Sequence, residues 1–195
     1  EPVPTPTDEN LARWVQARLA MSGIVQVSVQ SAGDRGVTVN REGRTHCWQR
    51  FRFEAAHQLP NVPLDHQCGR MHGHGFEVIL RGAGPDSARL EAAWMPVHEQ
   101  LHWACLNDLP GLENPTSERL AAWLWARLQP TLPELSRVTV YETATAGCHY
   151  DGNRYRIWKE RDFESALRLS SAPAHDARRR LHGHSYRLRL HLVAP

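Results

Sequence analysis

The fold of this chain is decided by two short stretches that each occur twice. The first occurrence is Phe53-Glu-Ala-Ala-His57-Gln-Leu59 followed by Arg70-Met-His72-Gly-His74-Gly-Phe76. The second comes 110 residues later, without a gap, as Phe163-Glu-Ser-Ala-Leu167-Arg-Leu169 and Arg180-Leu-His182-Gly-His184-Ser-Tyr186. A constant offset of this size is typical of a structural module that is repeated along the chain.

A further match connects the N-terminal region with the middle of the chain. Pro6-Thr-Asp-Glu-Asn-Leu-Ala-Arg-Trp14-Val-Gln-Ala-Arg-Leu19 resembles Pro115-Thr-Ser-Glu-Arg-Leu-Ala-Ala-Trp123-Leu-Trp-Ala-Arg-Leu128, which lies 109 residues later. We therefore expect one complete module at 49–157. Residues 158–195 together with 1–48 would form a degenerate partner module in two pieces, whose middle segment, equivalent to 82–112, is absent.

Three arrangements are compatible with this order of repeats. The chain could be a fragment of a three-module protein, or a circularly permuted protein of two modules. Alternatively, the order or content of the sequence differs from that of the biological chain. The two pieces are complementary halves without overlap, which favours a single partner module.

Apolar periodicity predicts a β-β-α-α-β-β order for the complete module. Alternating apolar residues favour strands, and three- to four-residue spacing favours helices. The expected strands are 49–59, 75–80, 137–142 and 154–159, and the expected helices are 87–102 and 118–128. Pro96 would bend or divide the first helix, and Thr116 or Ser117 would cap the second. Strand pairs separated by helices indicate an α+β fold with an antiparallel sheet and helices on one face.

Composition excludes several classes of protein. The chain has 195 residues, 41% hydrophobic and 23% charged, and its net charge of +2 is too small to predict a nucleic-acid-binding surface. No apolar stretch approaches the ~20 residues of a membrane span, and the first residues do not resemble a signal peptide. Four cysteines without regular spacing favour free thiols and a cytoplasmic location. The twelve histidines instead suggest metal or acid–base chemistry.

Three of these histidines form a candidate metal site. His72 and His74 open a predicted strand and point to the same face, and His57 ends the preceding strand. Three imidazoles with an open fourth position are typical of catalytic Zn²⁺. The alternative is that they are ordinary polar residues at strand ends. The partner module has Leu167 at the position of His57, so its site would be vestigial.

Two further residues are candidates for chemistry beside the metal. Cys68 lies in a polar loop near His66 and Arg70, which would favour the thiolate and make it a nucleophile or general base. Glu142 ends an apolar strand, where an acid is usually a solvent-facing residue. A carboxylate can also accept two parallel N–H bonds from an aminopyrimidinone ring. The aligned position of the partner module, near Ser31, has no acid.

These motifs together resemble the 6-pyruvoyl-tetrahydropterin synthase superfamily, specifically its 6-carboxytetrahydropterin synthase branch. The resemblance covers 49–157 and rests on four spaced motifs. They are Phe53-x-x-x-His57-x-Leu59, His66-Gln-Cys68-Gly-Arg-Met-His72-Gly-His74, Cys105-Leu-Asn107-Asp-Leu-Pro-Gly111-Leu-Glu-Asn-Pro115-Thr116 and Tyr141-Glu142-Thr143-Ala-Thr-Ala-Gly147-Cys148.

The resemblance implies a T-fold in which two modules per chain form part of a barrel completed by a homo-oligomer. It implies conversion of 7,8-dihydroneopterin triphosphate to 6-carboxytetrahydropterin in queuosine biosynthesis, with release of acetaldehyde and triphosphate. Carried over by motif, the site residues would be Zn²⁺ ligands His57, His72 and His74, the catalytic thiol of Cys68, and substrate-binding Glu142 and Thr116. Neither nucleic acid nor membrane is an expected partner.

One segment departs from the family pattern. The family has Leu-Asp-His-x-x-Leu-Asn, in which Asp and His relay protons, whereas this chain has Leu101-His102-Trp103-Ala-Cys105-Leu-Asn107. Either the partner module supplies the relay, or His102 acts as a displaced relay. The alternative functions are a 6-pyruvoyl-tetrahydropterin synthase-like lyase and a non-catalytic pterin- or purine-binding module. A structural metalloprotein is disfavoured by the lack of a fourth ligand.

Overall fold

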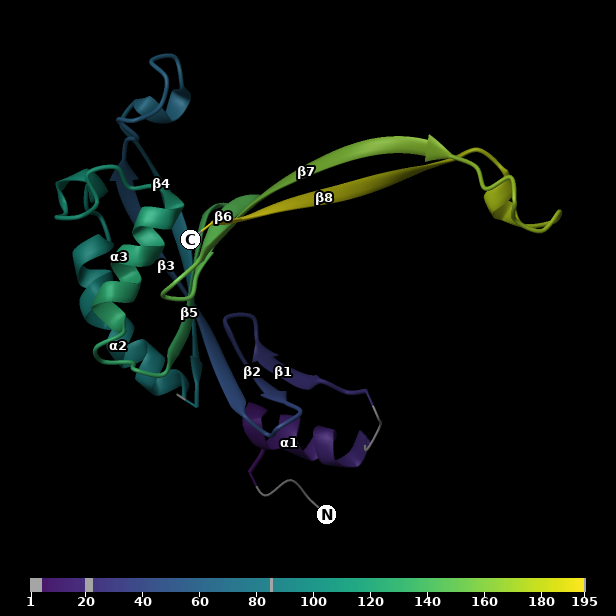
Figure 1. Ribbon diagram of the computed structural model, residues 1–195, viewed down its shortest axis with the longest axis horizontal. Coiled ribbons are helices and arrows are strands. Elements are labelled where there is room, and N and C mark those ends of the chain that lie inside the picture. Colours follow the sequence, from purple (N-terminus) through teal and green to yellow (C-terminus); the bar gives the residue numbers. More distant parts are fainter. Residues whose placement is uncertain (1–4, 20–22, 85, 195) are drawn as a thin grey trace.

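The computed structural model describes residues 5–19, 23–84 and 86–194, and within them the chain folds around one antiparallel sheet. Its eight strands follow one another in chain order (Figure 1). The helices are α1 Asp8–Leu19, α2 Ser87–Leu101 and α3 Ser117–Leu128. The strands are β1 Gln26–Ala32, β2 Arg35–Asn40, β3 Thr45–His57, β4 His72–Ala83, β5 Leu135–Thr143, β6 Ala146–Tyr150, β7 Tyr155–Leu167 and β8 His182–Ala194. The α+β fold expected from the sequence is confirmed.

The helices cover one face of the sheet, because strands such as β3 and β4 place buried apolar residues at alternate positions. Phe53 of β3 lies opposite Phe76 of β4, and their rings stack with centroids 5.0 Å apart. Trp94 of α2 stacks on Phe51 at 5.0 Å. The apolar stripe of α3 is buried over β5 and β6. This layer of aromatic and aliphatic side chains is the core of the molecule.

Helix boundaries agree closely with the sequence pattern. Thr116 caps α3 by accepting the backbone N–H of Arg119 at 3.3 Å. Asp86 caps α2 in the same way, with its Oδ1 2.8 Å from the backbone nitrogen of Arg89. Pro96 lies inside α2 without dividing it into two helices.

The strand pattern after α3 differs from the expectation. A short strand, β6, lies between the two strands predicted there, and the last of these extends over Tyr155–Leu167. The sequence pattern does not predict β6, because Gly147 interrupts the alternation of apolar residues in this strand. A Cβ at Gly147 would collide with the backbone carbonyl oxygen of Val140 and would lie 2.6 Å from the Trp158 ring, so backbone and side-chain atoms together leave no space for a side chain. A Cβ at Gly36 of β2 would likewise lie 2.7 Å from the Trp48 side chain.

The interval predicted for the complete module, 49–157, ends inside a continuous strand. β7 begins at Tyr155, and β7 and β8 follow β3 and β4 by 110 residues. The predicted strand 154–159 corresponds to the start of β7, which pairs with both β6 and β8. The described elements of the complete module that precede β7 are β3, β4, α2, α3, β5 and β6.

The two pieces of the partner module lie at opposite edges of the sheet. α1, β1 and β2 adjoin β3, whereas β7 and β8 adjoin β6 (Figure 1). One chain therefore does not bring these pieces together into a second module. Residues 1–4, 20–22, 85 and 195 lie outside the described residues, among them part of the N-terminal stretch judged for a signal peptide.

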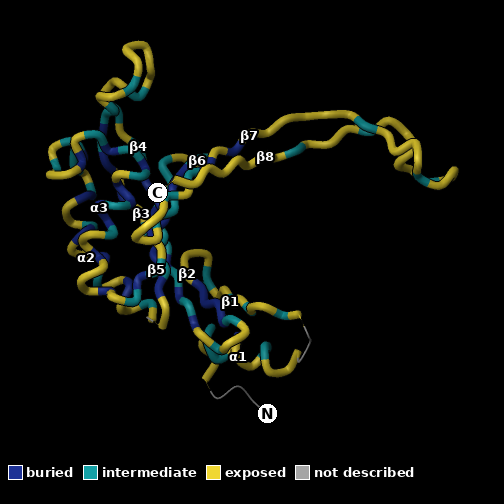
Figure 2. Tube along the Cα trace, viewed as in Figure 1, coloured by how far each residue is buried: buried dark blue, intermediate teal, exposed yellow. Residues whose placement is uncertain are grey.

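The β7–β8 hairpin has an uncovered apolar face, and Figure 2 shows it as mostly exposed. Leu188 and Leu190 are 48% and 62% exposed, whereas their equivalents Val78 and Leu80 are completely buried. Phe163 is 50% exposed, and its equivalent Phe53 is 1% exposed. Among the described residues, none of the helices has both the length and the apolar character to cross a bilayer.

Candidate metal centre and substrate site

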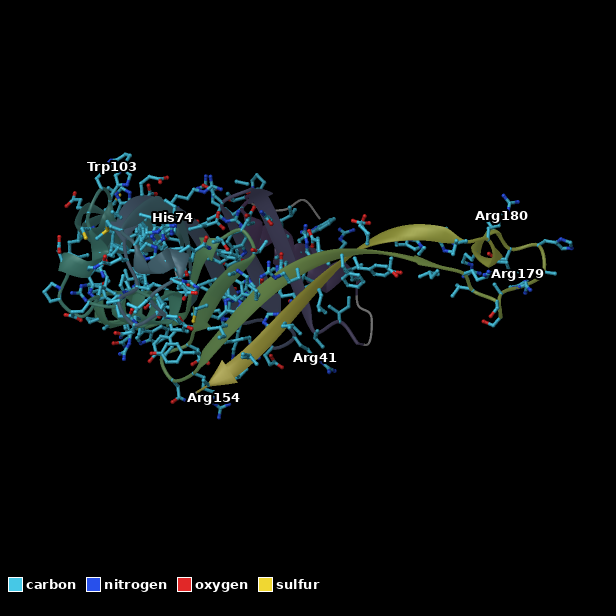
Figure 3. All side chains as sticks on the ribbon, turned by 90° about the horizontal axis from the view of Figure 1, so that it is seen from above. Arg41, His74, Trp103, Arg154, Arg179 and Arg180 are labelled. Atoms are coloured by element: carbon cyan, nitrogen blue, oxygen red, sulfur yellow. The ribbon has the colours of Figure 1, made fainter. Side chains whose placement is uncertain are left out.

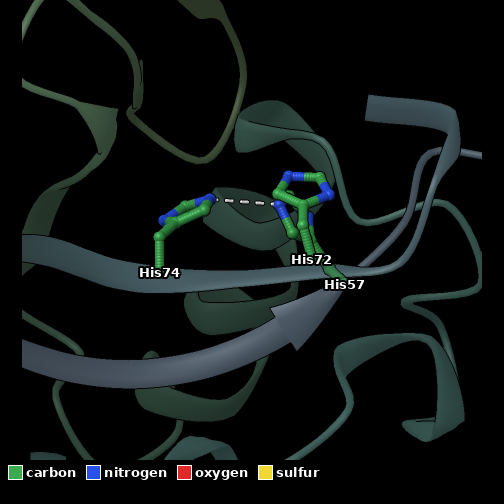
Figure 4. A group of neighbouring side chains, drawn as sticks. All are labelled: His57, His72 and His74. Atoms are coloured by element: carbon green, nitrogen blue, oxygen red, sulfur yellow. Dashed lines mark hydrogen bonds between the residues drawn. The ribbon is translucent and has the colours of Figure 1, made fainter. Parts of the chain in front are cut away.

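The three candidate histidines meet at one end of the β3–β4 hairpin. His57 and His72 are directly opposite each other, and His74 lies opposite Ala55. All three share the helix-covered face with Phe76, as the two-residue period of a strand requires. Their ligand atoms lie within 4.8 Å of one another, and the Nε2 atoms of His57 and His74 are 3.1 Å apart (Figure 4). The cluster expected from the sequence is present and could hold a metal ion.

Backbone carbonyls orient two of the imidazole rings. The Nδ1 atom of His72 lies 2.7 Å from the Arg70 carbonyl oxygen, and that of His74 lies 3.1 Å from the Gly75 carbonyl oxygen. A carbonyl oxygen only accepts hydrogen bonds, so both rings carry their proton on Nδ1. The Nε2 lone pairs are left for a metal. This arrangement, with the second nitrogen donating to the backbone, is typical of histidine ligands.

His57 is held in the neutral form that a metal requires. Its side chain is completely buried, and burial lowers its pKa. Glu142 opposes this effect, whereas His72 and His74 lower the pKa further. The buried Nδ1 atom of His57 has no hydrogen-bond partner of normal geometry. The nearby backbone of Pro115 acts against the effect of burial, because it raises the pKa of His57. Closely spaced imidazoles with free lone pairs fit a borderline-soft divalent cation.

Glu142 of β5 lies beside this cluster, as the sequence motif predicts. Its Oε1 atom is 4.0 Å from His57 Nε2, and its side chain is 22% exposed. Ser117, at the start of α3, donates its hydroxyl to Glu142 Oε2 at 2.9 Å. The sequence did not single out Ser117, since it stands next to the capping Thr116 and either could have served as the cap. With Thr116 capping the helix, Ser117 is free to orient the carboxylate.

Cys68 lies in the loop between β3 and β4, in the short helix Gln67–Gly69. Its backbone nitrogen donates to His66 Nδ1 at 3.2 Å, and its carbonyl oxygen accepts from Leu59 at 2.8 Å. These contacts fix the base of the loop. The thiol is half-buried and does not belong to the group of convergent ligand atoms. Its position is compatible with a role other than metal binding.

His102 and Trp103 contact the backbone of β3. His102 Nδ1 accepts the Glu54 N–H at 3.1 Å, and its ring stacks on His98 at 4.7 Å. The backbone N–H of Trp103 donates to the Glu54 carbonyl oxygen at 2.7 Å, and Trp103 has a φ of 64°. Such a left-handed conformation is uncommon for a bulky residue. Its side chain is 78% exposed. Both backbone groups of Glu54 are thus satisfied by this loop.

The second copy of the motif lacks a third imidazole. His182 and His184 open β8, and Leu167 occupies the position opposite His182. Arg178, which takes the place of Cys68, forms an ion pair with Asp176 at 2.6 Å. Two imidazoles and an aliphatic side chain make an incomplete coordination set. The predicted difference between the two copies is therefore visible in their side chains.

Comparisons with known proteins find similarity over part of this chain. A family model described as 6-pyruvoyl tetrahydropterin synthase matches residues 46–153. A Synechocystis protein named 6-carboxy-5,6,7,8-tetrahydropterin synthase is 38% identical over 118 residues, covering 53% of this chain and 90% of the relative. The structure of Caenorhabditis elegans 6-pyruvoyl tetrahydropterin synthase matches with a TM-score of 0.46 and 21% identity, over 51% of this chain and 89% of that one. The family match includes every candidate site residue described above.

Proposed function

Because the chain belongs to the 6-pyruvoyl tetrahydropterin synthase family, we propose that it is a zinc-dependent 6-carboxytetrahydropterin synthase. It would convert 7,8-dihydroneopterin triphosphate and one water molecule to 6-carboxy-5,6,7,8-tetrahydropterin, with release of acetaldehyde and triphosphate, in queuosine biosynthesis. The name of the 38% identical relative supports this reaction. The observation that carries the proposal is the cluster of three histidines with the Glu142 carboxylate 4.0 Å from His57.

The donor set supports Zn²⁺ as the metal. Three imidazoles from one hairpin leave a fourth coordination position for the substrate, which distinguishes a catalytic zinc site from a closed structural one. His57, His72 and His74 would hold the ion through the nitrogen lone pairs described above. When bound, Zn²⁺ supplies Lewis acidity toward the hydroxyls of the substrate side chain.

Glu142 is proposed to anchor the pterin ring. Its two carboxylate oxygens can accept two parallel N–H bonds, and Oε2 keeps a second acceptor site although it already accepts from Ser117. Ser117 limits rotation of the carboxylate and so positions the ring relative to the histidines. Thr116 would contribute from the same helix start. Fixing the ring in one orientation lowers the entropic part of the barrier.

Cys68 and His102 are proposed to transfer protons. The Cys68 thiol lies at the end of the hairpin that carries the ligands. His102 accepts the Glu54 N–H through Nδ1, so its neutral ring carries a proton on Nε2 and can donate it. The family's aspartate–histidine relay would be supplied by the partner module, or His102 would act in its place.

We also propose that copies of the chain associate edge to edge as a homo-oligomer that continues a T-fold barrel in the cytoplasm. In the complete module, Val78 and Leu80 of β4 pair with Val140 and Val138 of β5. The repeat transfers this register to Leu188 and Leu190 of β8, which would face Val29 and Val27 of β1 in a second copy. Apolar residues then meet on the exposed hairpin face. Four free cysteines support a reducing compartment.

The test of the reaction is product analysis with the zinc-loaded chain. We expect 6-carboxytetrahydropterin and acetaldehyde from 7,8-dihydroneopterin triphosphate. Cys68→Ala should slow turnover by ~10²–10⁴-fold, because it removes a proton-transfer group, while zinc content stays constant. Cys105→Ala, which changes another half-buried thiol, is the matched control and should retain activity.

Three other outcomes would contradict the proposal. A pyruvoyl product without acetaldehyde would assign the chain to the other branch of the family. Pterin binding without turnover would indicate a binding module. Undiminished turnover in Cys68→Ala would exclude the thiol from the reaction.

A further inference from the structure

A cavity lies on the face of the sheet opposite the helices, at the end of β5 away from Glu142. Its volume is about 230 Å³. It is lined by Arg137, His149, Asp151, Arg154, Tyr155, Arg156 and Val193, which come from β5, β6, β7, β8 and the β6–β7 turn. Arg137 is five residues from Glu142 along β5, which corresponds to ~17 Å. This β5–β7 pocket is therefore separate from the histidine cluster.

The pocket concentrates positive charge. Arg137 lies directly opposite Arg81 on the neighbouring strand, and Arg156 lies opposite His149. Arg154 approaches from the turn, where Figure 3 shows it at the end of the sheet. Like charges directly opposite each other destabilise a sheet. The one carboxylate among the lining residues is Asp151, and its Oδ1 already accepts the backbone N–H groups of Asn153 and Arg154 at 3.0 and 2.8 Å.

Most arginines elsewhere in the described sheet have acidic partners, although Arg161 of β7 forms no ion pair with a described carboxylate. Arg187 pairs with Asp162 at 2.9 Å, and both Arg50 and Arg52 pair with Glu77 at 3.2 Å. By contrast, none of the four arginines in and beside the pocket forms an ion pair with a described carboxylate; they are Arg81, Arg137, Arg154 and Arg156. The excess positive charge is local and is not a general property of the sheet.

The internal repeat provides a direct comparison. The junction of β2 and β3 has the same pairing as the junction of β6 and β7, with Thr38 opposite His46 where His149 is opposite Arg156. Ser28 contacts Thr38 there at 3.0 Å, as Thr139 contacts His149 at 2.8 Å. In that junction the positions of Arg137 and Arg156 are occupied by Gln26 and His46, whereas Arg44 stands at the position of Arg154. Arg137 and Arg156 are thus additions to the repeated architecture, and they increase the positive charge beside Arg154.

We propose that the β5–β7 pocket binds a small oligophosphate anion through Arg137, Arg154 and Arg156. Guanidinium groups bind phosphate oxygens in a planar, bidentate manner and remain charged at all physiological pH values. The cavity is below the ~300 Å³ at which sites for drug-sized ligands begin, so it fits a chain of phosphates better than a nucleoside. A bound polyanion would also relieve the repulsion between the facing arginines.

His149 offers an independent signal for this binding. Burial lowers its pKa to about 4, and Arg137, Arg156, His191 and Arg189 contribute further. An anion among these groups favours the charged imidazole and therefore raises the pKa of His149. An NMR titration of the histidines, with His149→Gln for assignment, should show this shift on addition of inorganic triphosphate.

The binding test uses calorimetric titration of the full, zinc-loaded chain with inorganic triphosphate at low ionic strength. We expect Arg137→Gln and Arg156→Gln each to weaken binding by about ten- to hundred-fold, the usual loss of a charge-assisted hydrogen bond. Arg41→Gln removes the same charge from an exposed turn between β2 and β3 and should change affinity less than two-fold. His72→Ala should retain binding, which excludes the histidine cluster as the site.

The outcome can overturn the proposal in two ways. Absence of saturable binding to the unmodified chain would exclude the site. An equal loss of affinity in Arg41→Gln would show that triphosphate binding depends only on the net charge of the protein. A nucleoside triphosphate that binds more tightly than inorganic triphosphate would support the same arginines as the site for the phosphate tail of a larger ligand. Weaker binding of the nucleotide would support free oligophosphate.

Discussion

Glu142 shows how one side chain distinguishes the complete module from its degenerate repeat. The carboxylate is 4.0 Å from His57 and is oriented by the Ser117 hydroxyl. Ser31 stands at the corresponding position of β1, and its short hydroxyl lacks a second acceptor oxygen. The two copies therefore have the same backbone arrangement but differ in the side chain that could bind a ring with two adjacent N–H donors.

Replacing Glu142 tests this difference. Glu142→Gln should weaken binding of a pterin analogue by about ten- to hundred-fold, because the amide offers one acceptor and one clashing donor and leaves a ring N–H unpaired. Ser31→Ala is the matched control and should leave affinity unchanged. Fluorescence titration of the analogue measures both variants. Equal losses would mean that both modules bind the ligand.

The β3–β4 hairpin is the element that forms the candidate metal site. Its register places His57 opposite His72, and the two-residue period brings His74 to the same face. The β7–β8 hairpin has the same register, with Leu167 opposite His182. Identical local geometry thus yields a complete set of imidazoles in one hairpin and an incomplete set in the other.

Metal analysis of hairpin variants follows from this comparison. The purified chain should contain about one zinc ion, held by the complete module. His72→Ala should lose it, since two remaining imidazoles are a poor coordination set. His182→Ala makes the same change in the repeated hairpin and should keep the zinc. Full zinc occupancy in His72→Ala would contradict the assignment of three histidine ligands.

The whole molecule is a sheet with half-modules at both edges. The hairpin at one edge exposes Leu188, Leu190 and Leu192, whose equivalents in β4 face the helices. α1 and β1 at the other edge carry the sequence that matches α3 and β5. A contact between unlike edges is heterologous, so it can close into a ring. This is the geometry expected of a barrel built from several copies.

Association through these edges predicts a change in mass. The unmodified chain should elute as an oligomer of its 22.2 kDa unit, measured by light scattering after gel filtration. Leu190→Glu should shift the protein to a single unit, because it would bury a charge against Val27 of the next copy. Leu64→Glu, at a fully exposed loop position, should leave the oligomer intact. A monomeric unmodified chain would refute this interface.

The sequence by itself determined the features that depend on local spacing. The 110-residue offset is a property of the sequence, and the division into modules drawn from it stays a prediction. The α+β class is confirmed, and the cap of α3, predicted at Thr116 or Ser117, is Thr116. The convergence of His57, His72 and His74 is also confirmed. Each follows from the period of a strand or helix, which fixes the direction of a side chain without knowledge of its neighbours. Glu142 was found through a motif, and its proximity to His57 agrees with that assignment.

Only the tertiary structure decided which distant residues meet. β6 is a strand because β5 and β7 pair with it, although Gly147 breaks its pattern. Ser117 became relevant through its contact with Glu142, and the arginines of the β5–β7 pocket gather only when neighbouring strands align. The two pieces of the partner module lie at opposite edges because each pairs with the adjacent strand of the complete module. Pairing between strands is non-local, so the spacing of residues along the chain does not specify it.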